Sequence, residues 1–178
     1  MVEYVDLVLI HTPRAPACNS SAQIATTWQG MQQAVQQKLV RAIGVSNFDS
    51  KLLTALLGSP STKTTPAVNQ CCFHVGSHTD DDYEFCRKHS ITIEAYSSLG
   101  HPNGHGAAVY DLPLVKQIAS AHNVSGAQVG LKWIVQQGHT FVTASGESAY
   151  DVEDLDLWSF TLNATEMAAL SAFKESGQ

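Results

Sequence analysis

The stretch Tyr4-Val5-Asp6-Leu7-Val8-Leu9-Ile10-His11-Thr12-Pro13 decides the fold class of this chain. The run from Val5 to Ile10 is almost entirely apolar, which is typical of a strand buried on both faces of a parallel sheet. His11 follows at the carboxyl end of this strand, where α/β proteins bind ligands because their strand-to-helix loops converge there. A single histidine is more often structural than catalytic, so His11 is a candidate that needs support from the rest of the chain.

Strands that end in polar residues alternate with amphipathic helices along the whole sequence. Apolar runs predict further strands at 39–45, 66–70, 91–96 and 139–143. Helical spacing and capping residues predict helices at 24–38, 49–57, 79–88, 112–123, 126–137, 149–157 and 164–174. No hairpin turn joins two strands, which indicates a parallel sheet with right-handed crossovers and with every strand tip at one edge.

This alternation fits either an open doubly wound sheet or part of a closed barrel. The sequence contains neither G-x-G-x-x-G nor a Walker A loop, the usual phosphate-binding motifs of open sheets. Polar residues end several different strands instead: His11, Ser46 with Asn47, Asn69 with Gln70, and Tyr96 with Ser97. Barrels build their sites in this way. We therefore predict an α/β fold, a partial (β/α)8 TIM-type barrel of about five parallel strands with intervening helices, in a single domain over residues 1–178.

Charge and composition exclude several classes of protein. Ten Lys and Arg against sixteen Asp and Glu give a net charge of -6, which disfavours nucleic acid as a partner. The sequence shows no apolar stretch of membrane-spanning length and no signal peptide, so we expect no membrane partner and a cytoplasmic location. The cysteines lack C-x-x-C spacing, and His74, His78, His101 and His105 lack partners at fixed spacing, so we expect reduced thiols and no metal site.

Four segments together resemble a known family in order and spacing. They are Tyr4 to His11, Leu39 to Phe48 with its Gly-Val-Ser-Asn-Phe motif, Pro66 to Gln70 with Val-Asn-Gln, and Ala95 to Gly100. The sequence resembles the aldo-keto reductases, and the likeness continues from Ala127 to Leu170. The resemblance implies a TIM-type barrel and an oxidoreductase that uses NADP or NAD to reduce aldehydes and ketones to alcohols. The implied partner is a small carbonyl substrate, whose identity the sequence leaves open.

The resemblance also implies roles for the strand tips. His11 matches the histidine that orients the substrate carbonyl. The residues that match cofactor contacts are Ser46, Asn47 and Gln70 for the nicotinamide carboxamide, Tyr96 for the nicotinamide ring, Ser97 and Leu99 for the pyrophosphate, and Ser145, Glu153 and Asp154 for the adenine. The chemistry agrees, because amide and hydroxyl side chains match a carboxamide and an aromatic face matches a planar ring. The alternatives are a helix cap at Ser46-Asn47 and a satisfied strand end at Gln70.

The sequence departs from the family pattern before His11. The family pairs its histidine with a proton-donating tyrosine, a lysine and an aspartate on segments that precede the histidine strand, and this chain begins at that strand. Tyr4 cannot replace the tyrosine, because it lies about 20 Å from His11 at the opposite end of the strand. General acid catalysis contributes about 10²–10⁴-fold. We therefore expect a chain truncated on its N-terminal side and inactive by itself.

A second departure follows the last strand. The family commonly reads I-P-K-S with an arginine six residues beyond the lysine, whereas this chain has Val142-Thr143-Ala144-Ser145 and then Tyr150. Lysine and arginine would neutralise the 2′-phosphate of NADP, so Ala144 and Tyr150 remove its charge partners. A preference for NAD, weak cofactor binding and no cofactor binding are each compatible with this change.

Three functions remain open at the level of sequence. The first is a reductase of the family, represented by its carboxyl-terminal part. The second is a non-catalytic remnant that binds dinucleotide. The third is an interaction module that pairs the apolar edges of its sheet with another chain, and such edges predict self-association.

Overall fold

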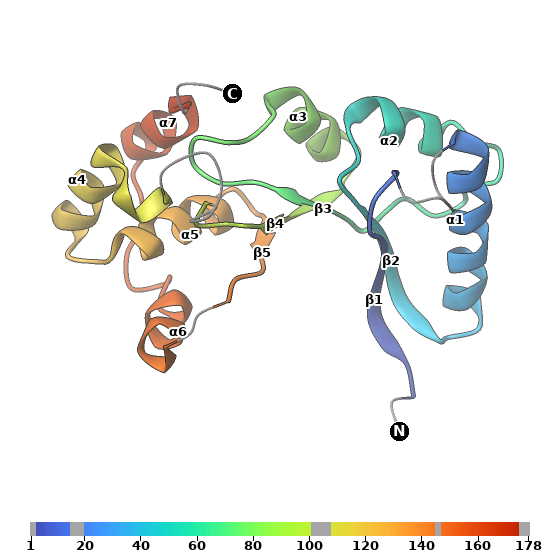
Figure 1. The fold of residues 1–178 in the computed structure, drawn as a ribbon, viewed down its shortest axis with the longest axis horizontal. Helices are drawn as coiled ribbons and strands as arrows, with labels where there is room; N and C mark the ends of the chain where they lie inside the picture. The colour runs from blue at the N-terminus through green and yellow to red at the C-terminus, as the bar shows by residue number, and fades with distance from the viewer. Residues whose placement is uncertain (1–2, 15–19, 101–107, 145–146, 175–178) are drawn as a thin grey trace. The chain divides into compact units, whose positions relative to one another are not determined.

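The computed structural model describes residues 3–14, 20–100, 108–144 and 147–174 (Figure 1). Within these ranges, five strands alternate with helices, and the strands form one sheet in the order β1-β2-β3-β4-β5. The chain divides into two compact units. The amino-terminal unit comprises Met1–Cys71 and Thr79–Ile93, and the carboxyl-terminal unit comprises Cys72–His78 and Glu94–Gln178. Each unit is described in turn.

Parallel strands form the centre of the amino-terminal unit. Its strands are β1 (Val5–Ile10), β2 (Val40–Ser46) and β3 (Val68–Cys72), and β4 (Thr92–Tyr96) begins in it. The register pairs Ile10 with Val45 and Ser46 with Gln70, so the carboxyl ends of the first three strands lie side by side. The amide of Thr92 donates to the carbonyl of Ala67 over 3.0 Å, which starts the pairing of β4.

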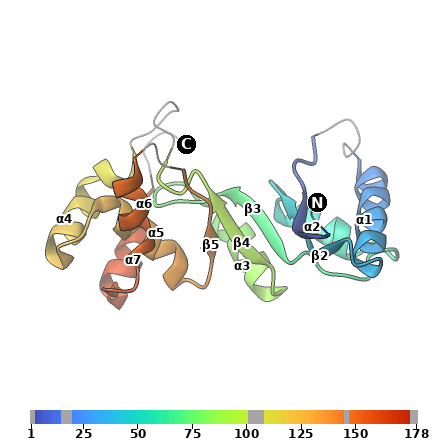
Figure 2. The same cartoon turned by 90° about the horizontal axis from the view of Figure 1, so that it is seen from below.

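Three helices belong to the same unit: α1 (Ser21–Gln36), α2 (Ser50–Leu57) and α3 (Asp80–Lys88). α1 packs against β2 and buries Ile24 and Trp28 (Figure 2). Asp49 is the N-cap of α2, and its carboxylate accepts from the amide of Leu52 over 2.8 Å, as the capping pattern predicts. All three helices lie within two or three residues of their predicted limits, because caps and apolar spacing act locally.

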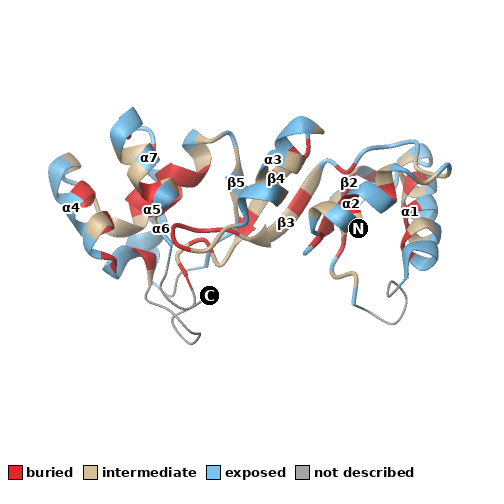
Figure 3. Ribbon diagram, turned by 90° about the horizontal axis from the view of Figure 1, so that it is seen from above, coloured by how far each residue is buried: buried red, intermediate tan, exposed pale blue. Residues whose placement is uncertain are grey.

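The carboxyl-terminal unit is mostly helical. It contains the end of β4, the 3₁₀ turn η1 (Val109–Asp111), α4 (Pro113–His122), α5 (Gly126–Gln136), β5 (Thr140–Phe141), α6 (Ser148–Leu155) and α7 (Ala164–Ala172). Every residue of α5 from Gln128 to Ile134 is buried, and Figure 3 shows this helix largely in red. The ring of Phe73 stacks on that of Trp133 at a centroid distance of 5.0 Å. α5 is therefore the core element of this unit.

β5 is shorter than the sequence predicts. A strand was expected over 139–143, but the structure has only Thr140–Phe141, paired with Glu94 and Ala95. One further bond runs from the amide of Val142 to the carbonyl of Ala95 over 2.8 Å. β5 is the last strand in the sheet order, and Val142, Thr143 and Ala144 are exposed. An edge strand has partners on one side only, so its pairing ends early.

Candidate functional site

Polar residues from three strand ends meet in the amino-terminal unit. Ser46 pairs with Gln70 in the register of β2 and β3, and the amide of Asn47 donates to the carbonyl of Gln70 over 2.9 Å. The Nδ2 of Asn47 donates to the carbonyl of His11 over 3.0 Å. The structure therefore brings together His11, Ser46, Asn47 and Gln70 at the carboxyl edge of β1 to β3, as the sequence predicts.

Asn47 connects these strand ends through an uncommon backbone conformation. Its φ of 61° lies in the left-handed region, which asparagine tolerates better than most residues. The Nδ2 of Asn47 also lies 2.9 Å from the Oγ of Ser46, as donor to that hydroxyl. Ser46 is buried and Asn47 is exposed, so this turn leads from the core to the solvent edge of the strands.

Asn69 lies next to Gln70 in sequence but has a different role. It is buried, its Nδ2 donates to the carbonyl of Phe48 over 2.7 Å, and its Oδ1 accepts from the amide of Phe48 at 3.4 Å. Successive residues of a strand point to opposite faces, which separates Asn69 from Gln70. Burial raises the pKa of the neighbouring Cys86 thiol, which therefore stays protonated. The two hydrogen bonds between the Asn69 side chain and the backbone of Phe48 hold the turn that carries Ser46 and Asn47.

A second group of predicted residues lies in the carboxyl-terminal unit. Tyr96, Ser97 and Leu99 line a cavity of about 500 Å³. The other residues that line it are Ser98, Gly100, Tyr110, Val142, Thr143 and Ala144. The loop after β4 turns sharply, because Ser97 and Gly100 have φ values of 51° and 83° and the amide of Gly100 donates to the carbonyl of Ser97 over 2.8 Å. Tyr96 and the residues of this bend therefore line the same cavity.

Ser98 supports this cavity, although the sequence does not single it out. Its side chain is buried, and its Oγ lies 3.1 Å from the carbonyl oxygen of Ala95 and 3.2 Å from that of Val142. The hydroxyl therefore bridges the ends of β4 and β5. The position of Ser98 shortly after the end of β4 was the sequence signal that could have indicated this role. The direction of its side chain, however, depends on the positive φ of the preceding Ser97.

The residues expected near an adenine lie on α6. Glu153 is exposed and Asp154 is buried, while Ser145 falls outside the described residues. Burial, followed by the charges of Asp151 and Glu153, raises the pKa of Asp154. Glu153 lines a second cavity of about 500 Å³ with His122, Gln128 and Phe160. Neither Glu153 nor Asp154 is among the residues that line the Tyr96 cavity.

No group of three or more His, Cys, Asp or Glu side chains within the described ranges is arranged to hold a metal ion. His101 and His105 lie outside those ranges. The Nδ1 of His74 lies 3.0 Å from the carbonyl of Val75, and the ring of His78 contacts Phe73 and Lys174. Over the same ranges, no helix is both long and apolar enough to cross a membrane.

Comparison with known proteins places these features in a family. The model of the Aldo/keto reductase family matches residues 1–175. The chain belongs to this family. A crystal structure of an aldo/keto reductase from Brucella melitensis superposes with a TM-score of 0.84 at 33% identity and covers 96% of this chain. The predicted partial TIM-type barrel is thereby confirmed, since this chain covers 61% of that one.

Two curated aldo/keto reductase relatives give the same picture. The chain is 35% identical over 174 residues to the 9,11-endoperoxide prostaglandin H2 reductase of Trypanosoma cruzi. It is 32% identical over 189 aligned residues to the NADPH-dependent codeinone reductase 1-4 of Papaver somniferum. Each alignment covers 98% of this chain but 58% of the relative, so the chain spans less than two thirds of their length.

Proposed function

We propose that this aldo/keto reductase is an NAD(P)-dependent oxidoreductase that reduces a small aldehyde or ketone to an alcohol. The observation that carries the proposal is the meeting of His11, Ser46, Asn47 and Gln70 at the carboxyl ends of three adjacent parallel strands. The names of the two relatives, both reductases, support it.

The side chains at this edge fit the carboxamide of a nicotinamide. Ser46 offers a hydroxyl and Asn47 and Gln70 offer amides, which together supply donors and acceptors to a group that needs both. The bonds from Asn47 to His11 and Gln70 hold the strand ends in register, which reduces the cost of ordering them around a ligand. When bound, a reduced nicotinamide would supply a hydride to the carbonyl carbon, and a proton from water or from an acid group would complete the alcohol.

We assign His11 to the carbonyl oxygen of the substrate. The side chain is exposed at the end of β1, and its backbone carbonyl is tied to Asn47 over 3.0 Å. An imidazole N–H can donate to a carbonyl oxygen and polarise it, and such a donor stabilises the negative charge that develops on the oxygen during reduction. His11 thus orients the substrate.

The carboxyl-terminal unit offers its own groups suited to a dinucleotide. Tyr96 lines a cavity of about 500 Å³, a volume in the usual range for ligand pockets, and an aromatic side chain suits a planar ring. The carboxylates of Glu153 and Asp154 on α6 are suited to accept from the amino group of an adenine. The charge on α6 is unfavourable for the 2′-phosphate of NADP, so we propose that NADH is the preferred cofactor.

Titration of the recombinant chain with NADH, followed by nicotinamide fluorescence, tests the proposal. Asn47→Gly removes the carboxamide while keeping a residue that accepts φ of 61°, and it should weaken NADH binding about tenfold. Lys38→Gly is the control, because Lys38 is also exposed with a φ of 61° and is not among the residues that line the Tyr96 or the Glu153 cavity. Equal NADH affinity of the wild type and Asn47→Gly would contradict the assignment.

Cofactor preference is tested separately. The wild type should bind NADPH no better than NADH, because the resemblance to the family assigns the phosphate partners to the positions of Ala144 and Tyr150, which carry no positive charge. The double change Ala144→Lys with Tyr150→Arg should raise the affinity for NADPH relative to NADH about tenfold, or about 1.4 kcal/mol. A wild type that already prefers NADPH tenfold would show that another residue supplies the charge.

Turnover is measured apart from binding, with NADH and a panel of small aldehydes. We expect NADH to bind without turnover, because the chain is expected to be inactive by itself. Turnover that His11→Ala abolishes would contradict this expectation and would show a working reductase. The second candidate function, a dinucleotide-binding protein that has lost its chemistry, gives the same result as the first in this assay. Absence of both NADH binding and turnover would reject both functions.

A further inference from the structure

Three polar side chains of α5 form hydrogen bonds with the backbone of the segment that follows α6. They are Gln128, Lys132 and Gln136, spaced four residues apart and hence on one face of the helix. The Nε2 of Gln128 donates to the carbonyl of Asp156 over 2.8 Å, and the Nζ of Lys132 donates to that of Leu157 over 2.6 Å.

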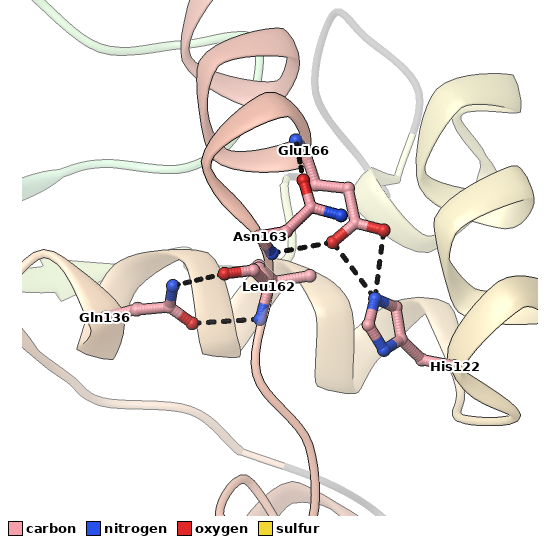
Figure 4. A network of polar contacts seen from close by, with 5 residues as sticks. All are labelled: His122, Gln136, Leu162, Asn163 and Glu166. Carbon is pink, nitrogen blue, oxygen red and sulfur yellow. Dashed lines mark hydrogen bonds and ion pairs between the residues drawn. The ribbon is translucent and has the colours of Figure 1, made fainter.

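Gln136 makes the third attachment, to the end of the loop before α7. Its Nε2 donates to the carbonyl of Leu162 over 2.6 Å, and its Oε1 accepts from the amide of Leu162 over 3.1 Å (Figure 4). One face of α5 therefore holds the chain at Asp156, Leu157 and Leu162. We call these three contacts the α5 anchors.

Lys132 is the most unusual of the three side chains. It is only 5% exposed, and its described contacts are a backbone carbonyl and two aromatic rings rather than a carboxylate. The ammonium lies 5.1 Å from the ring centroid of Trp158 and 5.5 Å from that of Phe160. A buried cation is costly, so Lys132 stabilises this segment only while the carbonyl and both rings stay in place around it. The interaction is therefore specific for one position of residues 157–160.

The anchors determine the position of α6, because α6 has little apolar packing of its own. Asp154 is its only buried residue, and Val152 and Leu155 are 69% and 77% exposed. Gln128 and Lys132 bind the two residues that immediately follow Leu155, the end of the helix. Glu153 and Asp154 lie within one helical turn of these bonds.

We propose that Lys132, supported by Gln128, is a positioning residue for the adenosine end of the dinucleotide. It touches no cofactor; it holds α6 so that Glu153 and Asp154 are correctly placed. This inference rests on the proposed function, in which those two acids contact the adenine. It adds that the affinity for the adenosine half depends on a buried lysine of a different helix.

The test compares NADH with reduced nicotinamide mononucleotide, which lacks the adenosine half, by fluorescence titration of the full chain. Lys132→Met keeps an unbranched apolar side chain and removes the donor. It should weaken NADH binding about tenfold and leave the affinity for the mononucleotide unchanged. Lys132→Arg, which keeps a donor cation, should recover most of the NADH affinity. Lys116→Met is the control, because Lys116 is exposed on α4 and pairs with Asp111.

The outcomes distinguish a failure of the proposed function from a failure of the role assigned to Lys132. A wild type that binds neither ligand overturns the proposed function and, with it, the role of Lys132. A wild type that binds NADH while Lys132→Met binds it equally well overturns the role of Lys132 alone. Equal losses for both ligands, with a lower melting temperature, show a merely structural role and also overturn it. If Lys132→Met does not fold, Gln128→Met removes the neighbouring anchor and must show the same selective loss.

Discussion

Single residues of this chain are constrained by the backbones of their neighbours, and Gly44 shows this most directly. An added Cβ would lie 2.7 Å from the Cδ2 of Leu9 and 2.7 Å from the carbonyl oxygen of Val68. These atoms belong to β1 and to β3, on the two sides of β2. The close approach of three strands at this point therefore requires glycine, which has no Cβ.

We predict that Gly44→Ala lowers the free energy of unfolding by about 1–3 kcal/mol, because the methyl group meets a backbone oxygen that cannot move freely. Gly30→Ala is the control. Gly30 lies inside α1 with no atom within 4 Å of its added Cβ, so alanine should stabilise the chain by about 0.5–1 kcal/mol. Urea unfolding of the two variants measures the difference, and equal stabilities would contradict the close packing of the strands.

The ion pair of Glu166 with His122 gives a pH-dependent effect (Figure 4). The Nε2 of His122 lies 2.9 Å from the Oε1 of Glu166, and the amide of Asn163 donates to the Oε2 over 2.8 Å. Partial burial raises the pKa of Glu166, but the Asn163 amide and His122 together lower it more. The net pKa lies below that of an unfolded glutamate. The carboxylate therefore stabilises the fold above about pH 4.3, and this contribution is lost as the pH falls through the lowered pKa.

We predict that Glu166→Gln lowers the free energy of unfolding by about 1 kcal/mol near neutral pH and has little effect at about pH 3. Glutamine can still accept from Asn163, so the change isolates the charge. Urea unfolding at several pH values measures the effect. Glu84→Gln is the control, because Glu84 and Arg87 form an exposed pair that contributes little. A difference that persists undiminished at low pH would contradict this account.

Whole helices in both units fasten loops through side chains four residues apart. In the amino-terminal unit, the Nε1 of Trp28 donates to the carbonyl of Thr64 over 3.0 Å. Gln32, one turn later, accepts from the amides of Lys63 and Thr64 over 2.6 and 2.9 Å and donates to the carbonyl of Ser61 over 3.0 Å. The α5 anchors follow the same arrangement. A buried glutamine can satisfy several backbone groups of a loop, which otherwise need water.

We predict that Gln32→Leu lowers the free energy of unfolding by about 1–3 kcal/mol, because backbone groups of Ser61, Lys63 and Thr64 lose their partner. Gln33→Leu, at the exposed neighbouring position of α1, should change it by less than about 0.5 kcal/mol. Thermal unfolding and hydrogen exchange check the pair, since only Gln32→Leu should speed amide exchange at Lys63 and Thr64. Unchanged protection in that variant would show that water replaces the side chain.

At the scale of the whole molecule, β1 is an edge of the sheet. Tyr4 and Val5 are 43% and 48% exposed, and Leu7, Val8 and Leu9 are only half-buried. An apolar edge strand presents unpaired backbone groups to other chains. We therefore propose that the chain self-associates through β1.

We predict an apparent mass that rises with protein concentration in size-exclusion chromatography with light scattering. Val5→Lys should weaken this association, because a charge on an edge strand opposes pairing. Val152→Lys is the control, since Val152 is 69% exposed on α6. If Val152→Lys alone produces monomers, the interface lies on α6 instead. A monodisperse wild-type monomer at every concentration would reject self-association.

Much of the fold could be predicted because the relevant forces are local. The apolar run of β1 predicted its limits without error, and Asp49 marks a helix start that the structure confirms. β3 shows the limit of such reasoning. Its strand was expected over 66–70 and lies at Val68–Cys72, because its pairing with β2 and not its own composition sets where it begins.

The sequence by itself determined that parallel strands would end in polar residues at one edge, since alternation of apolar and polar residues and short connections act along the chain. Only the tertiary structure decided which of those residues hold the backbone in place. Asn69 and Gln70 are equivalent in a sequence, yet the pleat turns Asn69 toward Phe48. No sequence pattern singles out Lys132, and only its contacts with Leu157, Trp158 and Phe160 make it an anchor. The reason is that hydrogen bonds between segments 20 to 40 residues apart depend on the final positions of both partners, which no local pattern specifies.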